Sequence, residues 1–73
     1  MNRDLLATHL KQAERHVVEG EEHIARQREL IVRLERQGHD IESAVKLLST
    51  FEQTQASHIA DRDRLRAELS ETQ

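Results

Sequence analysis

The 73-residue chain contains no cysteine, no proline, only two glycines and a single aromatic residue, Phe51. Without cysteine no disulfide can staple the fold, and without proline no residue is barred from a helix interior. The shortage of aromatic residues removes the stacking platforms on which single-stranded nucleic acids bind. No apolar run approaches the roughly 20 residues that span a bilayer. These absences leave long helices as the expected structure.

Charged residues make up 34% of the chain and apolar residues 36%, and the net charge is −3. This mildly acidic balance, without a long basic run, gives no sign of a nucleic-acid partner. Residues 1–4 carry an acid and lead into an amphipathic pattern, unlike a signal peptide, so a cytoplasmic location is expected. One core in fewer than ~70–80 residues rarely supplies more than ~3–5 kcal/mol of stability, so association is the natural source of further buried area.

Apolar residues recur over residues 6–34 at alternating intervals of four and three, the spacing of a coiled-coil seam. The pattern predicts a helix over about residues 3–36, with Asn2 or Asp4 as its N-cap. A second apolar row lies beside this seam, and together they are wider than one partner helix covers. The seam comprises Leu6, Leu10, Ala13, Val17, Gly20, Ile24, Gln27, Ile31 and Leu34, and the second row comprises Val18, Ala25 and Val32.

The same spacing returns after residue 40 and predicts a second helix over about residues 41–70. Between the helices, residues 37–40 form the predicted turn. Gly38 is suited to the left-handed conformation that ends a helix, and Asp40 can accept from the free N–H groups of the next first turn. The seam of the second helix comprises Ile41, Ala44, Leu48, Phe51, Gln55, His58, Arg62, Leu65 and Leu69, and Val45, Leu47 and Ile59 widen it.

Folding the two seams back at this turn pairs them along their whole length. Leu34 is expected opposite Ala44, and the position numbers of successive pairs then sum to 78 or 79. In the middle, Gly20 is expected opposite His58, and the glycine is expected to leave space for a bulky neighbour, either His58 or Arg62. The chain is therefore predicted to be all-α, a single domain over residues 1–73, in which an antiparallel two-helix hairpin dimerises into a four-helix bundle.

The middle layers of the predicted seam are polar, while both ends are apolar. Polar seam residues fix register and oligomeric state at some cost in stability, and a functional polar pocket stays open as an alternative. The polar layers contain Gly20, Gln27, Gln55, His58 and Arg62. The predicted interface comprises Leu10, Val17, Val18, Ile24, Ile31, Val32, Leu48, Phe51, Ile59 and Leu65.

The five histidines are the residues best suited to a site. His9, His16 and His23 recur every seven residues, roughly 10 Å apart along a helix, which is too far to share one metal ion. The best cluster that the pattern offers joins His16, His23, His58 and Asp61, but no Glu-x-x-His pair of the kind used by dinuclear bundles is present. Solvated histidines that support pH-dependent association are the simpler interpretation. No metal and no cofactor is predicted.

His16 also resembles the phosphate-accepting residue of histidine phosphotransfer bundles, which lies in a His-x-x-Lys-Gly pattern. The sequence here keeps Gly20 but has Glu19 where the phosphate needs a cation. No nucleophile–base–orienter set and no glycine-rich phosphate loop can be assembled from the remaining residues. The chain is therefore not expected to be an enzyme.

Positive charge is concentrated in the second half of the first helix, where two glutamates lie among Arg26, Arg28, Arg33 and Arg36. A solvated helix face is the plain interpretation. The alternative is an RNA-binding face on a hairpin dimer, by analogy with the architecture of small RNA-binding hairpins. The predicted function is a small non-catalytic interaction module that binds itself or a helical protein. An RNA-binding dimer is the alternative, and a histidine-based metal-binding bundle is a lesser one.

Four segments carry a resemblance to known sequences: HVVEGEEHIARQR (16–28), LERQGHD (34–40), AVKLLSTFE (44–52) and HIADRDRL (58–65). They are similar to a family of short, uncharacterised bacterial proteins. The resemblance extends over roughly residues 6–69. It implies a free-standing small bacterial protein that folds as a helical hairpin, and it implies nothing about mechanism.

Overall fold

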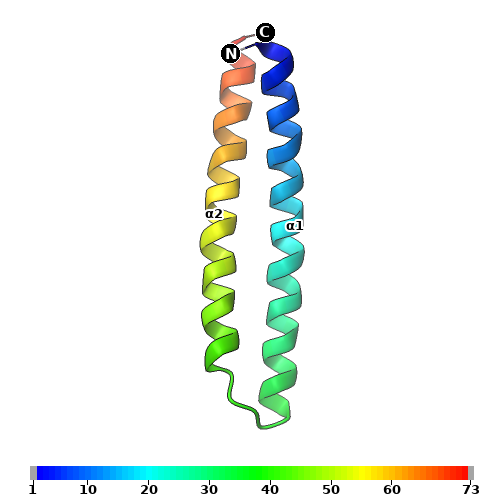
Figure 1. The fold of residues 1–73 in the computed structure, drawn as a ribbon, viewed down its shortest axis with the longest axis vertical. Coiled ribbons are helices and arrows are strands. Elements are labelled where there is room, and N and C mark those ends of the chain that lie inside the picture. The colour runs from blue at the N-terminus through cyan, green and yellow to red at the C-terminus, as the bar shows by residue number, and fades with distance from the viewer. Residues whose placement is uncertain (1, 73) are drawn as a thin grey trace.

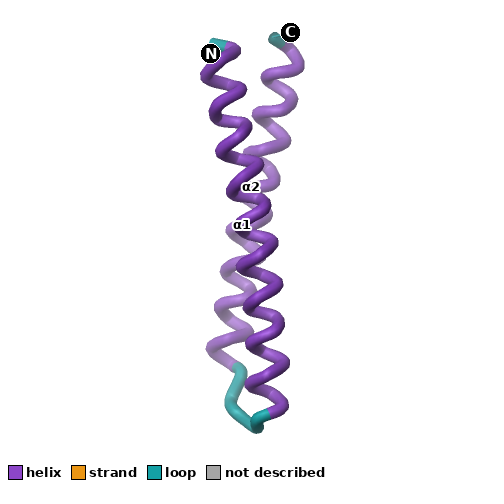
Figure 2. Tube along the Cα trace, turned by 90° about the vertical axis from the view of Figure 1, so that its right-hand side faces the viewer, coloured by secondary structure: helices purple, strands orange, loops and turns teal. Residues whose placement is uncertain are grey.

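The structure, a computed structural model, describes residues 2–72, which form two helices and no strand. Helix α1 spans Arg3–Arg36 and helix α2 spans Glu42–Glu71. They run antiparallel and side by side, so that the chain ends meet at one end of a rod and the turn forms the other (Figures 1 and 2). The Cα trace measures 55 × 14 × 13 Å. The prediction of an all-α chain of two helices is confirmed for the described residues, and Met1 and Gln73 lie outside them.

Helix α1 ends in a glycine-dependent motif. Gly38 has a φ of 74°, a left-handed conformation that glycine adopts without a Cβ clash. The N–H of His39 donates to the carbonyl of Leu34 at 2.9 Å, and the N–H of Gly38 donates to the carbonyl of Glu35 at 3.1 Å. These two bonds form a Schellman motif, which satisfies the last carbonyls of the helix and turns the chain out of its axis.

Both helices begin beside a polar side chain that accepts from a free backbone N–H. At the start of α1, the side chain of Asn2 accepts from the N–H of Asp4 at 2.6 Å. Before α2, the Oδ1 atom of Asp40 accepts from the N–H of Glu42 at 3.0 Å. Helix α2 begins one residue later than the sequence indicates, because Ile41 has non-helical torsion angles and acts as the N-cap residue. No helix within residues 2–72 combines the length and the hydropathy needed to cross a bilayer.

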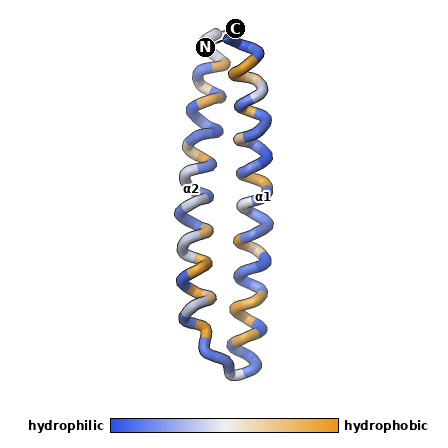
Figure 3. Tube along the Cα trace, in the orientation of Figure 1, coloured by the Kyte–Doolittle hydropathy of each residue, from blue (hydrophilic) through white to orange (hydrophobic). Residues whose placement is uncertain are grey.

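The seam predicted from the heptad spacing is the contact between the helices. Every one of its residues is buried or half-buried, and apolar positions recur along the inner edges of both helices (Figure 3). The best-packed part lies toward the chain ends, where Leu6, Ala13 and Leu65 are 2% to 3% exposed. Leu10 and Leu69 pack against them. Burial of these aliphatic groups stabilises the hairpin by roughly 25 cal/mol per Å² of apolar surface.

The predicted pairing of the two seams is wrong by about one helical turn. Gly20 lies against Gln55 rather than His58, and a Cβ added at Gly20 would be 2.7 Å from the Cδ atom of Gln55. Gln55 also bonds to the carbonyl of Val17, so the position numbers of these two contacts sum to 75 and 72 instead of 78 or 79. The cause is the connection. Residues 37–41 climb back along α1 before α2 begins (Figure 1), and non-helical chain advances further per residue than a helix does.

Candidate functional site

The middle of the rod encloses a glutamine that is bonded at only one end. Gln55 is 7% exposed, and its Nε2 donates to the carbonyl of Val17 at 2.8 Å. Its Oε1 points at Gly20 and has no hydrogen-bond partner within residues 2–72. A mid-helix glycine costs roughly 1 kcal/mol relative to alanine. Gly20 leaves room for the amide of Gln55, which a Cβ at this position would displace.

A second glutamine bonds in the opposite direction across the seam. Gln27 is 7% exposed, and its Nε2 donates to the carbonyl of Ala44 at 2.9 Å. Each helix thus contributes one glutamine that binds the backbone of the other helix. A slip of one turn would break both bonds and bury two unpaired amides, which costs free energy. The polar layer accordingly favours one register, as polar seam residues do in coiled coils.

Three of the histidines meet a ring on the opposite helix. The rings of His16 and His58 have centroids 5.1 Å apart and are tilted by 42°. His23 lies beside Phe51 instead, with 6.0 Å between ring centroids. These four side chains border a hollow of about 80 Å³. The hollow is well below the roughly 300 Å³ at which pockets for organic ligands begin.

Asp61, the fourth residue of the candidate metal cluster, belongs to an exposed ion-pair network on α2. Arg64 donates to Asp61 and, at 3.1 Å, to Glu68. The hydrogen bond to Asp61 and then the one to Glu68 raise the pKa of the Arg64 guanidinium. Over residues 2–72, no three histidine, aspartate or glutamate side chains are placed to hold one metal ion. The structure thus brings His16 and His58 together but does not assemble the predicted cluster.

Six large aliphatic side chains are exposed among residues 2–72, and they include Leu5 and Leu47. The other four, two from each helix, lie on one side of the rod. On α1, Val18 and Val32 are 54% and 45% exposed, and Ala25 is exposed between them. On α2, Val45 and Ile59 are 44% and 36% exposed. We call these five residues the apolar face.

Two ion pairs that bridge the helices place these residues on the same side. Arg66 donates to Glu14 at 3.1 Å, and Arg28 lies 3.7 Å from Glu52. On α1, Val18 lies four residues, or one turn, after Glu14, and Val32 lies one turn after Arg28. The two apolar residues on α2 lie two turns to either side of Glu52. The apolar face therefore lies on one side of the rod and includes residues of both helices, with the ion pair of Arg28 and Glu52 near its middle. His16 lies on the other side of the seam.

The structure divides the predicted interface residues into two groups. Val18, Val32 and Ile59 face outward and are free to meet another chain. Val45 also faces outward. It is not among the predicted interface residues, because the side of α2 that stays exposed depends on how the two helices pair. The other predicted interface residues are taken up by the seam inside the hairpin: Leu10, Val17, Ile24, Ile31, Leu48, Phe51 and Leu65.

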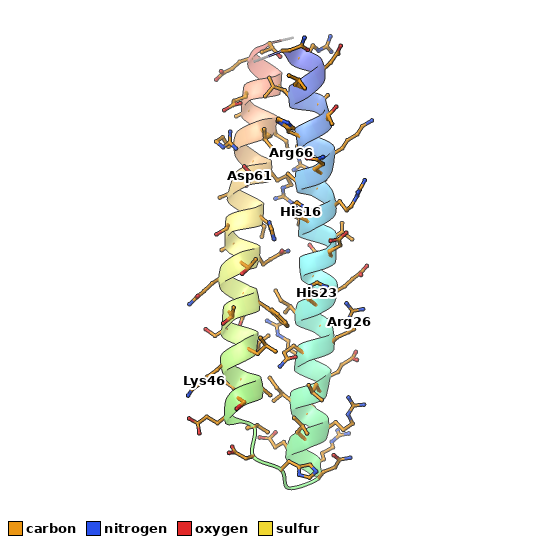
Figure 4. The ribbon with its side chains drawn as sticks, viewed as in Figure 1. His16, His23, Arg26, Lys46, Asp61 and Arg66 are labelled. Atoms are coloured by element: carbon orange, nitrogen blue, oxygen red, sulfur yellow. The ribbon has the colours of Figure 1, made fainter. Side chains whose placement is uncertain are left out.

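The arginine-rich end of α1 borders an open hollow of about 600 Å³. Arg28, Arg33 and Arg36 line it, together with one glutamate and Val32. Arg26 projects outward from α1 and does not border the hollow (Figure 4). The positive charge predicted for this segment is thus gathered around one residue of the apolar face.

Comparison with known proteins adds no relative to this description. No protein-family model, no curated protein and no solved structure matches the chain. The resemblance to a family of short bacterial proteins therefore stays a prediction. The surfaces of the hairpin are thus the features that bear on its function.

Proposed function

We propose that this chain is a non-catalytic self-association module, in which two hairpins pair through their apolar faces into a four-helix bundle. The observation that carries the proposal is the apolar face itself. Its four large aliphatic side chains are 36% to 54% exposed and lie on one side of the rod. Exposed aliphatic side chains gathered on one side of a protein favour a binding site for another protein surface. The apolar stripe of α1 is also wider than α2 alone covers.

The accessible surface of the rod supports the same proposal. The hairpin exposes 5460 Å², whereas a compact monomer of its 8.5 kDa exposes about 4,650 Å². The difference of about 800 Å² is what one partner contributes to a protein interface of standard size. Pairing two hairpins would bring the area per chain close to the value typical of its mass.

Sedimentation equilibrium at micromolar concentration tests the proposal. We expect a dimer for the natural chain and a monomer for Val32→Asp, because an unpaired carboxylate in an apolar interface is costly. Val32 lies outside the seam, so the circular dichroism of the variant should retain its helical signal. Ser57→Asp is the matched control, because Ser57 is exposed and lies off the apolar face. A natural chain that sediments as a stably folded monomer would refute self-association.

A second candidate function is RNA binding by the arginine-lined hollow. The observation in its favour is that Arg28, Arg33 and Arg36 converge on one open hollow that only one carboxylate borders. Phosphate contacts of this kind give binding that weakens steeply with salt. Bulk RNA should then shift the chain on a native gel at low salt, and the double variant Arg28→Glu, Arg33→Glu should abolish the shift. The absence of a shift at low salt would remove this candidate.

A further inference from the structure

We propose that the two hairpins pair antiparallel, so that the turn of one copy lies beside the chain ends of the other and the two Ala25 residues face each other across a two-fold axis. This inference rests on the self-association proposed above. It adds the orientation of the partner, which the apolar face by itself leaves open.

The apolar face is symmetric about its own middle. On α1, Val18 and Val32 lie seven residues to either side of Ala25, and on α2 the two apolar residues lie seven residues to either side of Glu52. Because Gly20 contacts Gln55, Ala25 and Glu52 lie at nearly the same level along the rod, within about two residues or 3 Å. The face therefore consists of two apolar rungs placed equally far from a central point.

Two kinds of two-fold axis superpose such a pattern on itself. An axis perpendicular to the rod places Val18 opposite the partner's Val32 and puts the two turns at opposite ends. An axis parallel to the rod places Val18 opposite the partner's Ile59 and puts both turns at the same end. The apolar contacts are equivalent in number, so the choice between the two arrangements falls to charge.

The net charge of the chain lies in one half of the rod. Residues 24–55, which we call the turn half, carry five basic and five acidic side chains. The remaining residues, the terminal half, carry six basic and nine acidic side chains and so hold the whole net charge of −3. A parallel axis would stack two terminal halves and bring like charges together. The perpendicular axis stacks each terminal half on a neutral turn half, which avoids this repulsion.

The charges that flank the two valines of α1 complement each other. Val18 has a glutamate one turn away on each side, Glu14 and Glu22. Val32 has an arginine one turn away on each side, Arg28 and Arg36, and all three border the same hollow. In the antiparallel arrangement a valine between two glutamates therefore enters a hollow between two arginines.

In the antiparallel arrangement, two residues of the paired α1 helices lie opposite each other when their position numbers add to 50. Like charges meet in three places: Glu21 with the partner's Glu29, twice by symmetry, and Glu52 with the partner's Glu52 at the axis, where Arg28 lies 3.7 Å from Glu52 of its own chain. Opposite charges meet in six places, because each of three pairs occurs twice by symmetry: Glu22 with the partner's Arg28, Glu14 with the partner's Arg36, and Arg15 with the partner's Glu35. Under the parallel axis, Glu14 would instead approach the partner's Asp63, which lies one turn after Ile59.

Single cysteines test the orientation directly, because the natural chain has none. Ala25→Cys should form a covalent dimer under mild oxidation, since the two side chains meet at the axis within the short Cα separation that a disulfide requires. Val18→Cys and Val32→Cys should each remain uncross-linked alone and should cross-link when unfolded and refolded together. Ser57→Cys, off the apolar face, is the control, and Ala25→Cys should cross-link at least about tenfold faster than it does.

The outcomes separate this inference from the proposed function. A natural chain that sediments as a monomer overturns both. A sedimenting dimer in which Ala25→Cys fails to cross-link overturns the antiparallel orientation and leaves self-association in place. Val18→Cys that cross-links to Ile59→Cys when the two are refolded together, and not to Val32→Cys, places both turns at the same end and likewise overturns the inference. Each cysteine variant is sedimented in reducing buffer first, so that loss of the dimer is not mistaken for a change of orientation.

Discussion

The terminal half and the turn half of the hairpin share one seam pattern but bury different residues. In the terminal half, the almost fully buried side chains are aliphatic, and Leu6 and Leu65 are 2% and 3% exposed. In the turn half they are the two glutamines, Gln27 and Gln55, each 7% exposed. Aliphatic seam residues of the turn half, such as Leu48, are only half-buried.

The two halves of the seam therefore contribute differently to stability and to register. Aliphatic burial is non-directional, so the terminal half supplies stability without specifying a register. The glutamines bond to the carbonyls of Val17 and Ala44 on the opposite helix, and such bonds are lost when the helices slip. The turn half thus specifies the register and contributes less stability for each residue.

The largest expected effect tests where stability resides. Leu65→Ala should lower the free energy of unfolding by about 2–4 kcal/mol, because it removes a buried side chain and leaves a cavity. Leu48→Ala should cost roughly 1 kcal/mol, because Leu48 is half-buried and its site can be solvated. Urea unfolding followed by circular dichroism, at one fixed protein concentration, measures both values. Equal losses would abolish the distinction between the halves.

The contact between Gly20 and Gln55 joins the two halves and is tested by a double-mutant cycle. In the Gln55→Ala background, Gly20→Ala should raise stability by about 1 kcal/mol, the gain in helix propensity. In the natural background the same change should be neutral or destabilising, because the new Cβ displaces the amide of Gln55. We expect a coupling energy of about 1–2 kcal/mol between the two positions. A coupling near zero would mean that Gln55 does not occupy the space above Gly20 in solution.

The turn half also depends on the backbone conformation of its glycine. Gly38→Ala should lower the free energy of unfolding by about 1–2 kcal/mol, because an L side chain is disfavoured at a φ of 74°. Gly38→Asn is the matched variant and should lose less, since asparagine tolerates the left-handed conformation. Thermal unfolding of the three chains measures this order. An alanine variant as stable as the natural chain would indicate that the helix ends without the Schellman motif.

The smallest expected effect concerns the ion pair of the terminal half. Arg66→Gln should change the free energy of unfolding by less than about 0.5 kcal/mol at 0.15 M salt, because both side chains are about half exposed and exposed pairs contribute little. Chemical unfolding at low and high salt checks this. A salt-sensitive loss above 1 kcal/mol would mean that charge, and not aliphatic burial, stabilises the terminal half.

The sequence predicted the seam well because helical periodicity is a local property. Each seam residue follows from intervals of three and four, and all of them are buried or half-buried in the structure. The end of α1 follows from the conformational freedom of Gly38, and the side chain of Asp40 accepts from the first turn of α2. These features depend on neighbours within one or two turns, so no knowledge of the other helix is needed.

The register escaped prediction because the seam repeats. When one helix slips by a turn along the other, seam positions still face seam positions. Several pairings of the two helices therefore satisfy the spacing equally well. The path of residues 37–41 decides among them, and that path places Gln55 rather than His58 beside Gly20. The same pairing leaves His23 beside Phe51 and apart from the other residues of the candidate metal cluster.

The sequence by itself determined two helices, where each ends and which stripe of each is buried, because backbone hydrogen bonds and capping act between near neighbours. Tertiary structure alone decided the register, the burial of the two glutamines and the gathering of Val18, Ala25, Val32, Val45 and Ile59 on one side. These depend on how far the connection carries α2 back along α1 and on which side chains fit there. Both are contacts between residues far apart in the chain, which periodicity does not encode.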